Sequence, residues 1–251
     1  MTNAAPTSDH ELAAAAATEA GRLLVALRAE LEAEHVWPPE VGDEGDRQAH
    51  RLLMSILHEA RPDDAVLSEE GRDDLARLES SRVWIVDPLD GTREFTEPGR
   101  SDWAVHVALA VDGQPVAGAV ALPALSLTLS TDPAPPAPAA WDGPVRIVVS
   151  RSRPPHQALR IREALDGQLL PLGSAGAKAM AVVLGEADVY AHAGGQYEWD
   201  SCAPVAVAAA AGLHVSRLDG SPLRYNRADP WLPDLLICRP ELAEPVLAAI
   251  T

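Results

Sequence analysis

The feature that most constrains this chain is the hexapeptide DPLDGT at residues 87–92, which directly follows an apolar run. The run predicts a short buried strand over Val83–Asp87, and the proline and glycine of the hexapeptide predict a turn after it. The strand thereby delivers Asp87 to its end, and the turn brings Asp90 back beside it. Two carboxylates held this close repel each other unless a cation lies between them, and hard oxygen ligands select Mg²⁺, Mn²⁺ or Ca²⁺. The alternative is an ordinary surface turn, where Asp-Pro and Asp-Gly are common.

Two other acidic segments have a similar setting. The segment SEEG at residues 68–71 follows an apolar triplet, which indicates either a second strand end with paired acids or a charged, solvated loop. Glu198–Pro204 opens an alanine-rich helix, and Asp200 within it suits the simple role of an N-cap. In the hexapeptide, Gly91 permits close backbone approach, and the amides of Gly91 and Thr92 are placed to meet a phosphate at the start of a helical turn.

The rest of the pattern predicts a short tail, a helical start and an α/β second half. Residues 1–8 read as a disordered tail, and residues 131–144, rich in Pro and Ala, read as a boundary or an exposed loop. Alternating strands and helices after this loop indicate α/β structure. Expected helices are Asp9–Glu34, Asp46–Ala60, His156–Leu165, Ala175–Leu184 and Ser201–Ala211. Expected strands are the hairpin Trp103–Val111 and Val116–Leu122, then Val145–Ser150, Ala187–Ala191, Leu213–Ser216 and Leu235–Cys238.

The charge and the cysteine content exclude several classes of protein. The formal net charge is -17, so a nucleic acid or an anionic membrane would be repelled, whereas a small anion bridged by cations would not. Two cysteines make no disulfide framework and suit a reducing cytoplasm. We see no signal-peptide pattern at the N-terminus, and the longest apolar runs, such as Ala104–Val111, are too short to span a bilayer. We therefore expect a cytoplasmic protein with neither nucleic-acid nor membrane partners.

Taken together, the three acidic segments resemble the inositol monophosphatase family of metal-dependent phosphatases. That family has an acidic pair, then Asp-Pro-Ile/Leu-Asp-Gly-Thr, then a late Trp-Asp, and all three occur here in this order and with similar spacing. The resemblance runs from the first helix to Leu236. It implies a layered αβαβα sandwich of the inositol monophosphatase and fructose-1,6-bisphosphatase type, with an α+β half fused to an α/β half. We expect an α+β metal-binding subdomain over 9–140 and an α/β substrate-binding subdomain over 145–251.

The resemblance also implies roles for individual residues. The implied metal ligands are Glu69, Asp87, Asp90, Asp200 and the backbone carbonyl of Leu89. The implied catalytic residues are Asp46, Glu69 and Thr92, of which Thr92 helps to activate the attacking water; Glu69 is preferred to Glu70 because the first glutamate of the family's pair is the ligand. The implied substrate contacts are Gly91, Thr92, Ser174, Lys178 and Asp200. The implied cofactor is Mg²⁺, about two or three ions per site with Mn²⁺ as a substitute, and inhibition by lithium is expected.

Within the family, stretches such as Gly45–Ala49 and Gly220–Asn226 resemble the CysQ-type 3′(2′),5′-bisphosphate nucleotidases. This branch implies hydrolysis of the 3′-phosphate of 3′-phosphoadenosine 5′-phosphate (PAP) to AMP and phosphate, with the sulfated form (PAPS) as a further substrate, in sulfate assimilation. Lys178 gives independent support because it is the only lysine of the chain, which indicates a need for a compact ammonium. The alternative is an ordinary surface lysine. Arg93, Arg100, Tyr225 and Trp231 stay outside the predicted site, since such residues are more often solvated or packed.

Other functions remain open from the sequence. The same chemistry could act on inositol monophosphate, histidinol phosphate or fructose 1,6-bisphosphate. A catalytically inactive metal or nucleotide sensor on the same fold is a second alternative, although every matched metal position keeps its acid. An acidic interaction protein without a small-molecule site is the third, and it leaves the ordered acidic turns unexplained. A homodimer is compatible with the family resemblance, but nothing in the sequence marks an interface.

Overall fold

The computed structural model describes residues 8–250, and its chain begins with two long helices, α1 (Asp9–Ala33) and α2 (Pro38–Ala60). Ser8 caps α1: its hydroxyl accepts from the amide of Glu11, whose side chain accepts from the amide of Ser8 in return. The helix predicted over 46–60 begins eight residues earlier, because Pro38 and Pro39 occupy the first helical positions, where a missing N–H costs nothing. Of the tail predicted over 1–8, residues 1–7 lie outside the described residues.

The first sheet has the strand order β1-β2-β3-β4-β5, with β1 parallel to β2 and the other pairs antiparallel. The predicted hairpin is confirmed: β3 and β4 are joined by Asp112 and Gly113, which both have positive φ, as a tight hairpin turn requires. The strands are β1 (Ala65–Ser68), β2 (Arg82–Asp90), β3 (Ala104–Val111), β4 (Gln114–Leu122) and β5 (Leu127–Ser130).

The second sheet has the order β7-β6-β8-β10-β9, in which β6 pairs in parallel with β7 and β8, and β10 runs antiparallel to both neighbours. Its strands are β6 (Arg146–Ser150), β7 (Gln168–Leu172), β8 (Val189–Tyr197), β9 (His214–Ser216) and β10 (Trp231–Cys238). The helices of this half are α4 (His156–Ala164), α5 (Ala175–Val183), α6 (Glu198–Ala210) and α7 (Ala243–Ile250).

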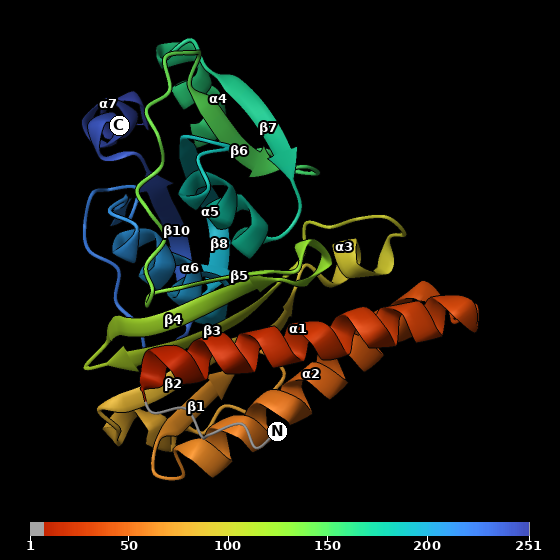
Figure 1. The fold of residues 1–251 in the computed structure, drawn as a ribbon. Helices are drawn as coiled ribbons and strands as arrows, with labels where there is room; N and C mark the ends of the chain where they lie inside the picture. Colours follow the sequence, from red (N-terminus) through yellow and green to blue (C-terminus); the bar gives the residue numbers. More distant parts are fainter. Residues whose placement is uncertain (1–7, 251) are drawn as a thin grey trace.

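The elements stack in five layers, which confirms the predicted αβαβα sandwich (Figure 1). One buried cluster joins α1 and α2 to the outer face of the first sheet. A second, between the two sheets, is built around α5 and α6. A third joins α4 and α7 to the far face of the second sheet. Since α5 and α6 lie between the sheets, their N-terminal ends can meet the end of a strand from the first sheet.

Several boundaries differ from the prediction. The helix α6 begins at Glu198, so Asp200 is its third residue and not its N-cap; its carboxylate still accepts from the amide of Tyr197, at 2.6 Å. The strand predicted over 187–191 is β8, which continues to Tyr197. The helical turn expected at Gly91 and Thr92 is α3 (Thr92–Thr96). The short elements that were not predicted are β5, β7, α7 and the 3₁₀ turns η1 (Leu75–Glu79), η2 (Pro123–Leu125) and η3 (Pro240–Leu242). Among the described residues, no helix has both the length and the apolar character needed to cross a membrane.

Candidate active site

A bulge at the end of β2 places Asp87 and Asp90 on the same side of the first sheet. Asp87 pairs with His106, and Asp90 pairs with Ala104. A spacing of three residues on β2 therefore lies opposite a spacing of two residues on β3. Residues three apart in a regular strand point to opposite faces, and one extra residue in a bulge reverses this. The amide of Leu89 donates to Asp87 Oδ1 at 3.1 Å and stabilises the turn. The prediction that Asp90 returns beside Asp87 is therefore matched by the geometry.

Asp200 completes a carboxylate cluster built from both halves of the molecule. One carboxylate oxygen from each of Asp87, Asp90 and Asp200 lies within 4.8 Å of the others. Asp87 and Asp90 are buried at the end of β2, and Asp200 comes from the first turn of α6. Three acidic oxygens at this separation are a donor set suited to a hard divalent cation.

Asp90 is clamped by the N-terminus of α5 and by a histidine that the sequence prediction missed. Its carboxylate accepts from the amides of Ala175 (3.1 Å) and Gly176 (2.5 Å) and lies 3.2 Å from His106 Nε2. A Cβ on Gly176 would lie 2.2 Å from this nitrogen, so only glycine fits there. Burial by itself lowers the pKa of His106, but the charge and hydrogen bond of Asp90, together with the hydrogen bond to the Trp199 carbonyl, outweigh it and leave the pKa raised. The pKa of Asp90 is held low in return. A single histidine inside an otherwise apolar strand was the signal available in the sequence.

The other acids of the site have raised pKa values, as crowded carboxylates should. Desolvation, followed by the charge of Asp200, raises the pKa of Glu69 to about 7. Desolvation and the charges of Glu70 and Glu69 raise that of Asp46 to about 7. Burial and the charge of Asp90 raise the pKa of Asp200 to about 6. Glu69 thus interacts with all three acids of the cluster without being one of the three, whereas Glu70 acts on both Asp46 and Glu69. A bound cation would relieve this repulsion, so the residues present fit a divalent metal.

Thr92 lies between the cluster and Asp46. Its hydroxyl is 3.5 Å from Asp46 Oδ2 and 3.3 Å from the carbonyl oxygen of Leu89, which links α2 to the turn after β2. Gly91 has φ of 89° and caps α3, and a Cβ there would lie 2.8 Å from the side chain of Ser174. The predicted residues Asp46, Leu89, Gly91, Thr92 and Ser174 are therefore brought together.

Lys178 is a buried residue beside the cluster and not a surface lysine. Its ammonium donates to the carbonyl oxygens of Gly173 and Ser174 and lies 5.5 Å from the centre of the Tyr190 ring. Burial lowers its pKa, against the opposing charge of Asp90. Together with Ser174, which caps α5, and with Asp90 and Asp200, it lines a cavity of about 480 Å³. A larger cavity of about 880 Å³, between α1, β5 and the 131–144 loop, contains none of the predicted site residues.

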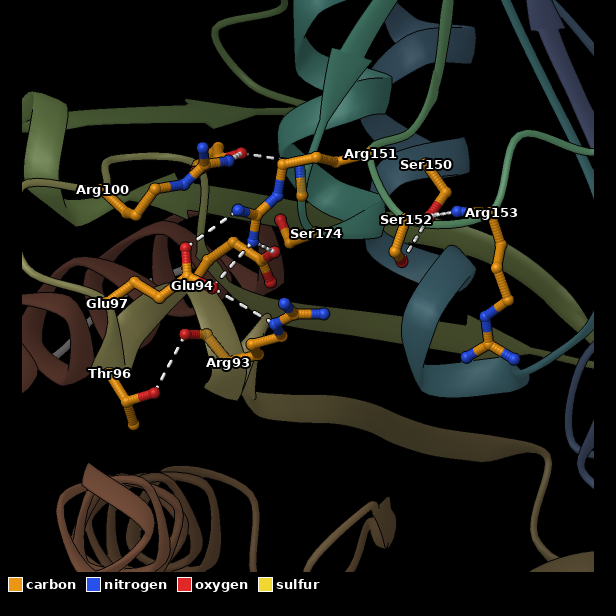
Figure 2. Close-up of polar contacts among 12 residues, drawn as sticks. Arg93, Glu94, Thr96, Glu97, Arg100, Ser150, Arg151, Ser152, Arg153 and Ser174 are labelled. Carbon is orange, nitrogen blue, oxygen red and sulfur yellow. Dashed lines mark hydrogen bonds and ion pairs between the residues drawn. The ribbon is translucent and has the colours of Figure 1, made fainter. Parts of the chain in front are cut away.

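Arginine–carboxylate pairs tie α3 to the second half of the molecule (Figure 2). Arg151, from the loop after β6, donates to Glu94 at 2.8 Å and to both carboxylate oxygens of Glu97. Arg93 also pairs with Glu97, and Arg100 pairs with Asp102. The two arginines left out of the predicted site therefore have carboxylate partners, and the network holds the helix that begins at Thr92 against the wall formed by Ser174.

The two-sheet sandwich and the acidic centre between its halves define a class: α/β proteins that hold hard cations with carboxylates at a strand end. The chain belongs to the Inositol monophosphatase family, whose sequence model matches residues 9–134 and 143–250. This confirms the resemblance seen in the sequence, and metal dependence is general in the family.

Curated relatives are similar over most of the chain. A protein of Mycobacterium bovis named 3′-phosphoadenosine 5′-phosphate phosphatase is 57% identical over 240 residues, which cover 92% of this chain and 89% of that protein. A protein of the same name from Mycobacterium leprae is 51% identical, and the match covers 98% of this chain and 94% of that protein. The 3′(2′),5′-bisphosphate nucleotidase CysQ of Escherichia coli is 34% identical, covering 74% and 80%.

Solved structures share the fold. Inositol monophosphatase II of Staphylococcus aureus superposes with a TM-score of 0.79 at 20% identity, covering 95% of this chain and 94% of that one. CysQ of Bacteroides thetaiotaomicron superposes with a TM-score of 0.76 at 28% identity, covering 92% of this chain and 97% of that one.

The metal-free protein is expected to lose stability as the pH rises from about 4 to 7, and Mg²⁺ to restore it. Asp46, Glu69 and Asp200 have folded-state pKa values of about 6 to 7. In this window the folded state binds more protons than the unfolded one, so the free energy of unfolding falls with rising pH. Thermal melts in EDTA and in about 10 mM Mg²⁺ should differ more at pH 8 than at pH 5. Identical melting temperatures at pH 8 would contradict a metal site here.

Proposed function

We propose that this chain is an Mg²⁺-dependent phosphomonoesterase that hydrolyses the 3′-phosphate of PAP to AMP and phosphate. The observation that carries this proposal is the convergence of Asp87 and Asp90, from β2, with Asp200, from the distant helix α6, beside a cavity lined by a buried lysine. The names of the relatives at 51% and 57% identity support PAP as the substrate. PAPS is proposed as a further substrate, and the place of the reaction is proposed to be sulfate assimilation in the cytoplasm.

The metal would be held by the carboxylates of the cluster and by one backbone oxygen. The proposed ligands are Glu69, Asp87, Asp90, Asp200 and the carbonyl of Leu89. When bound, Mg²⁺ supplies charge neutralisation at the phosphate oxygens and acidifies water, and Mn²⁺ would do the same. The protein contributes a fixed donor set: β2 and its bulge hold two of the acids, and the N-terminus of α5 fixes the orientation of Asp90.

Thr92 and Asp46 are placed to handle the proton of the attacking water. The Thr92 hydroxyl, within 3.5 Å of both Asp46 and the Leu89 carbonyl, accepts from the water and passes a proton toward Asp46. Asp46, with a pKa of about 7, suits a general base working near neutral pH, and Glu69 has a matching pKa. The water oxygen forms a bond to phosphorus in line with the ribose 3′-oxygen; the P–O3′ bond breaks, and the 3′-oxygen takes up a proton.

The opposite wall of the site binds the rest of the substrate. The backbone amides of Gly91 and Thr92 lie at the start of α3, and we propose that they donate to the phosphate. Lys178 uses two of its three N–H bonds on the carbonyls of Gly173 and Ser174, which leaves one donor and the positive charge for a phosphate. We propose that Ser174, Lys178 and Asp200 contact the nucleotide. The metal-binding role thus falls mainly on 9–140 and the substrate-binding role on 145–251, with Asp200 serving both, and a homodimer remains compatible with this arrangement.

The test is phosphate release from PAP, PAPS, inositol 1-phosphate and fructose 1,6-bisphosphate, each with Mg²⁺ and with EDTA. We expect kcat/KM for PAP to exceed that for inositol 1-phosphate and for fructose 1,6-bisphosphate by at least about tenfold, or about 1.4 kcal/mol. EDTA should abolish turnover, and LiCl at about tens of millimolar should inhibit it. A tenfold preference for the inositol ester would overturn the choice of substrate, and absence of metal-dependent release would favour a sensor on the same fold.

A further inference from the structure

Gln196 has a buried amide without a partner in the wall of the candidate active-site cavity. The residue is 6% exposed and lines the cavity together with Lys178 and Asp200. Neither its side-chain oxygen nor its side-chain nitrogen has a hydrogen-bond partner within the part of the chain that the structure describes. Buried amides are nearly always paired, because an unpaired one loses its hydration without compensation. A group that is absent from the free protein is therefore the natural partner.

The strand pairing places the Gln196 side chain on the cavity side of the second sheet. Gln196 pairs with Leu232 and His192 with Leu235, across the irregularity at Gly194 and Gly195. Leu232 and Leu235 belong to the same buried cluster between the sheets. Directly opposed residues share a face of a sheet, so Gln196 faces the same side as His192, which also lines the cavity.

Gln196 is also adjacent to the reacting centre. The next residue along β8, Tyr197, donates its amide to Asp200 at 2.6 Å. Gln196 thus precedes the residue that contacts Asp200, and it lines the same cavity as Asp90 and Asp200. The exposed rings of Tyr197 and Trp231 lie at the same end of the cavity as cross-strand partners.

We propose that the Gln196 amide is the specificity contact for the nucleoside half of the substrate. This inference rests on the proposed function and extends it to a residue that neither the family motif nor the metal site includes. An amide oxygen accepts and an amide NH₂ donates, so its best partner offers both functions. A phosphate only accepts, whereas a ribose hydroxyl and the edge of adenine each donate and accept. Inositol and fructose esters share the phosphate but lack the base.

The test compares the wild-type protein with Gln196→Met, which keeps the length of the side chain and removes the amide. For PAP, kcat/KM should fall by at least about tenfold, mainly through KM, because the nucleoside group loses its partner. For 2-glycerol phosphate, which has neither ribose nor base, the change should stay within about twofold. The melting temperature should be unchanged or higher, since an unpaired buried amide is removed. Gln168→Met, at an exposed position of β7, is the matched control.

Two analogues then identify the group that is recognised. If the ribose 2′-hydroxyl is the partner, 2′-deoxy-PAP should be a poorer substrate than PAP for the wild type but not for Gln196→Met. If the adenine edge is the partner, the purine riboside 3′,5′-bisphosphate, which lacks the exocyclic amine, should show this pattern instead. Either result supports the proposal.

Two results overturn the proposal: an unchanged kcat/KM for PAP in Gln196→Met, or an equal loss for PAP and 2-glycerol phosphate with a lower melting temperature, which would mark a structural role. A wild-type protein with no preference for PAP would instead refute the proposed function, so the two failures are distinguishable.

Discussion

Asp87→Asn is expected to remove nearly all PAP hydrolysis, with a loss in kcat of about 10³-fold or more, the scale on which a single electrostatic group at a reacting centre acts. Asp87 is 1% exposed and lies within the carboxylate cluster, so the substitution removes one of the three negative charges that a cation there would contact. The same substitution should not unfold the protein. Burial and the charges of Glu69 and Asp90 raise the pKa of Asp87, so in EDTA above neutral pH the neutral amide should melt at a higher temperature than the wild type.

The measurement is phosphate release at saturating Mg²⁺, paired with thermal melts in EDTA and in Mg²⁺. The variant should also lose most of the stabilisation that Mg²⁺ gives the wild type. Asp142→Asn, which changes the charge equally at an exposed position of the 131–144 loop, serves as the control and should leave both readouts unaltered. A loss in kcat of less than about tenfold would show that Asp87 is not an essential ligand of the metal site.

The convergence of Asp87 and Asp90 was predictable because both lie in one local feature. An apolar run followed by proline and glycine specifies a strand and its turn within a few residues, and these local preferences are the ones that a sequence expresses most directly. Asp200 and Glu69 were reached only through the family resemblance. From its local sequence alone, Asp200 suited an N-cap. In the structure it is the third residue of α6, and its carboxylate accepts from the amide of Tyr197 at the start of that helix.

The residues that support the cluster were not predictable, since their roles depend on contacts distant in the chain. His106 reads as an interruption in an apolar strand until β2 pairs with β3 and Asp90 comes within 3.2 Å. Gly176 reads as a flexible residue near a helix start until His106 fills the space that a Cβ would need. Gln196 carries no motif at all. Its importance follows only from burial without a partner, a property that exists in three dimensions.

Asp188→Ala should be strongly destabilising although it lies outside the active site, lowering the free energy of unfolding by about 3–5 kcal/mol, as when one member of a buried ion pair is removed. Asp188 is 1% exposed and accepts from Arg146 Nε, at 3.0 Å, and from Arg239 Nε, at 2.6 Å. It also accepts from the backbone amide of Arg146 at 2.8 Å. These bonds join the start of β6, the approach to β8 and the end of β10, so the variant leaves two guanidinium groups without their carboxylate inside the second half.

The pH dependence distinguishes this charge effect from simple loss of packing. Desolvation raises the pKa of Asp188, but its hydrogen bonds to Arg146 and Arg239 outweigh that and leave the pKa lowered. A carboxylate whose pKa is lowered in the folded state stabilises the protein fully at pH values above its unfolded-state pKa, which is near 4. That stabilisation is lost as the pH falls through the folded-state pKa. Urea unfolding at pH 7 should therefore show the full difference between wild type and variant, and the difference should shrink toward about pH 3. Asp63→Ala, at an exposed position, is the control. A difference below about 1 kcal/mol at pH 7, or one independent of pH, would show that the two arginines do not depend on this carboxylate.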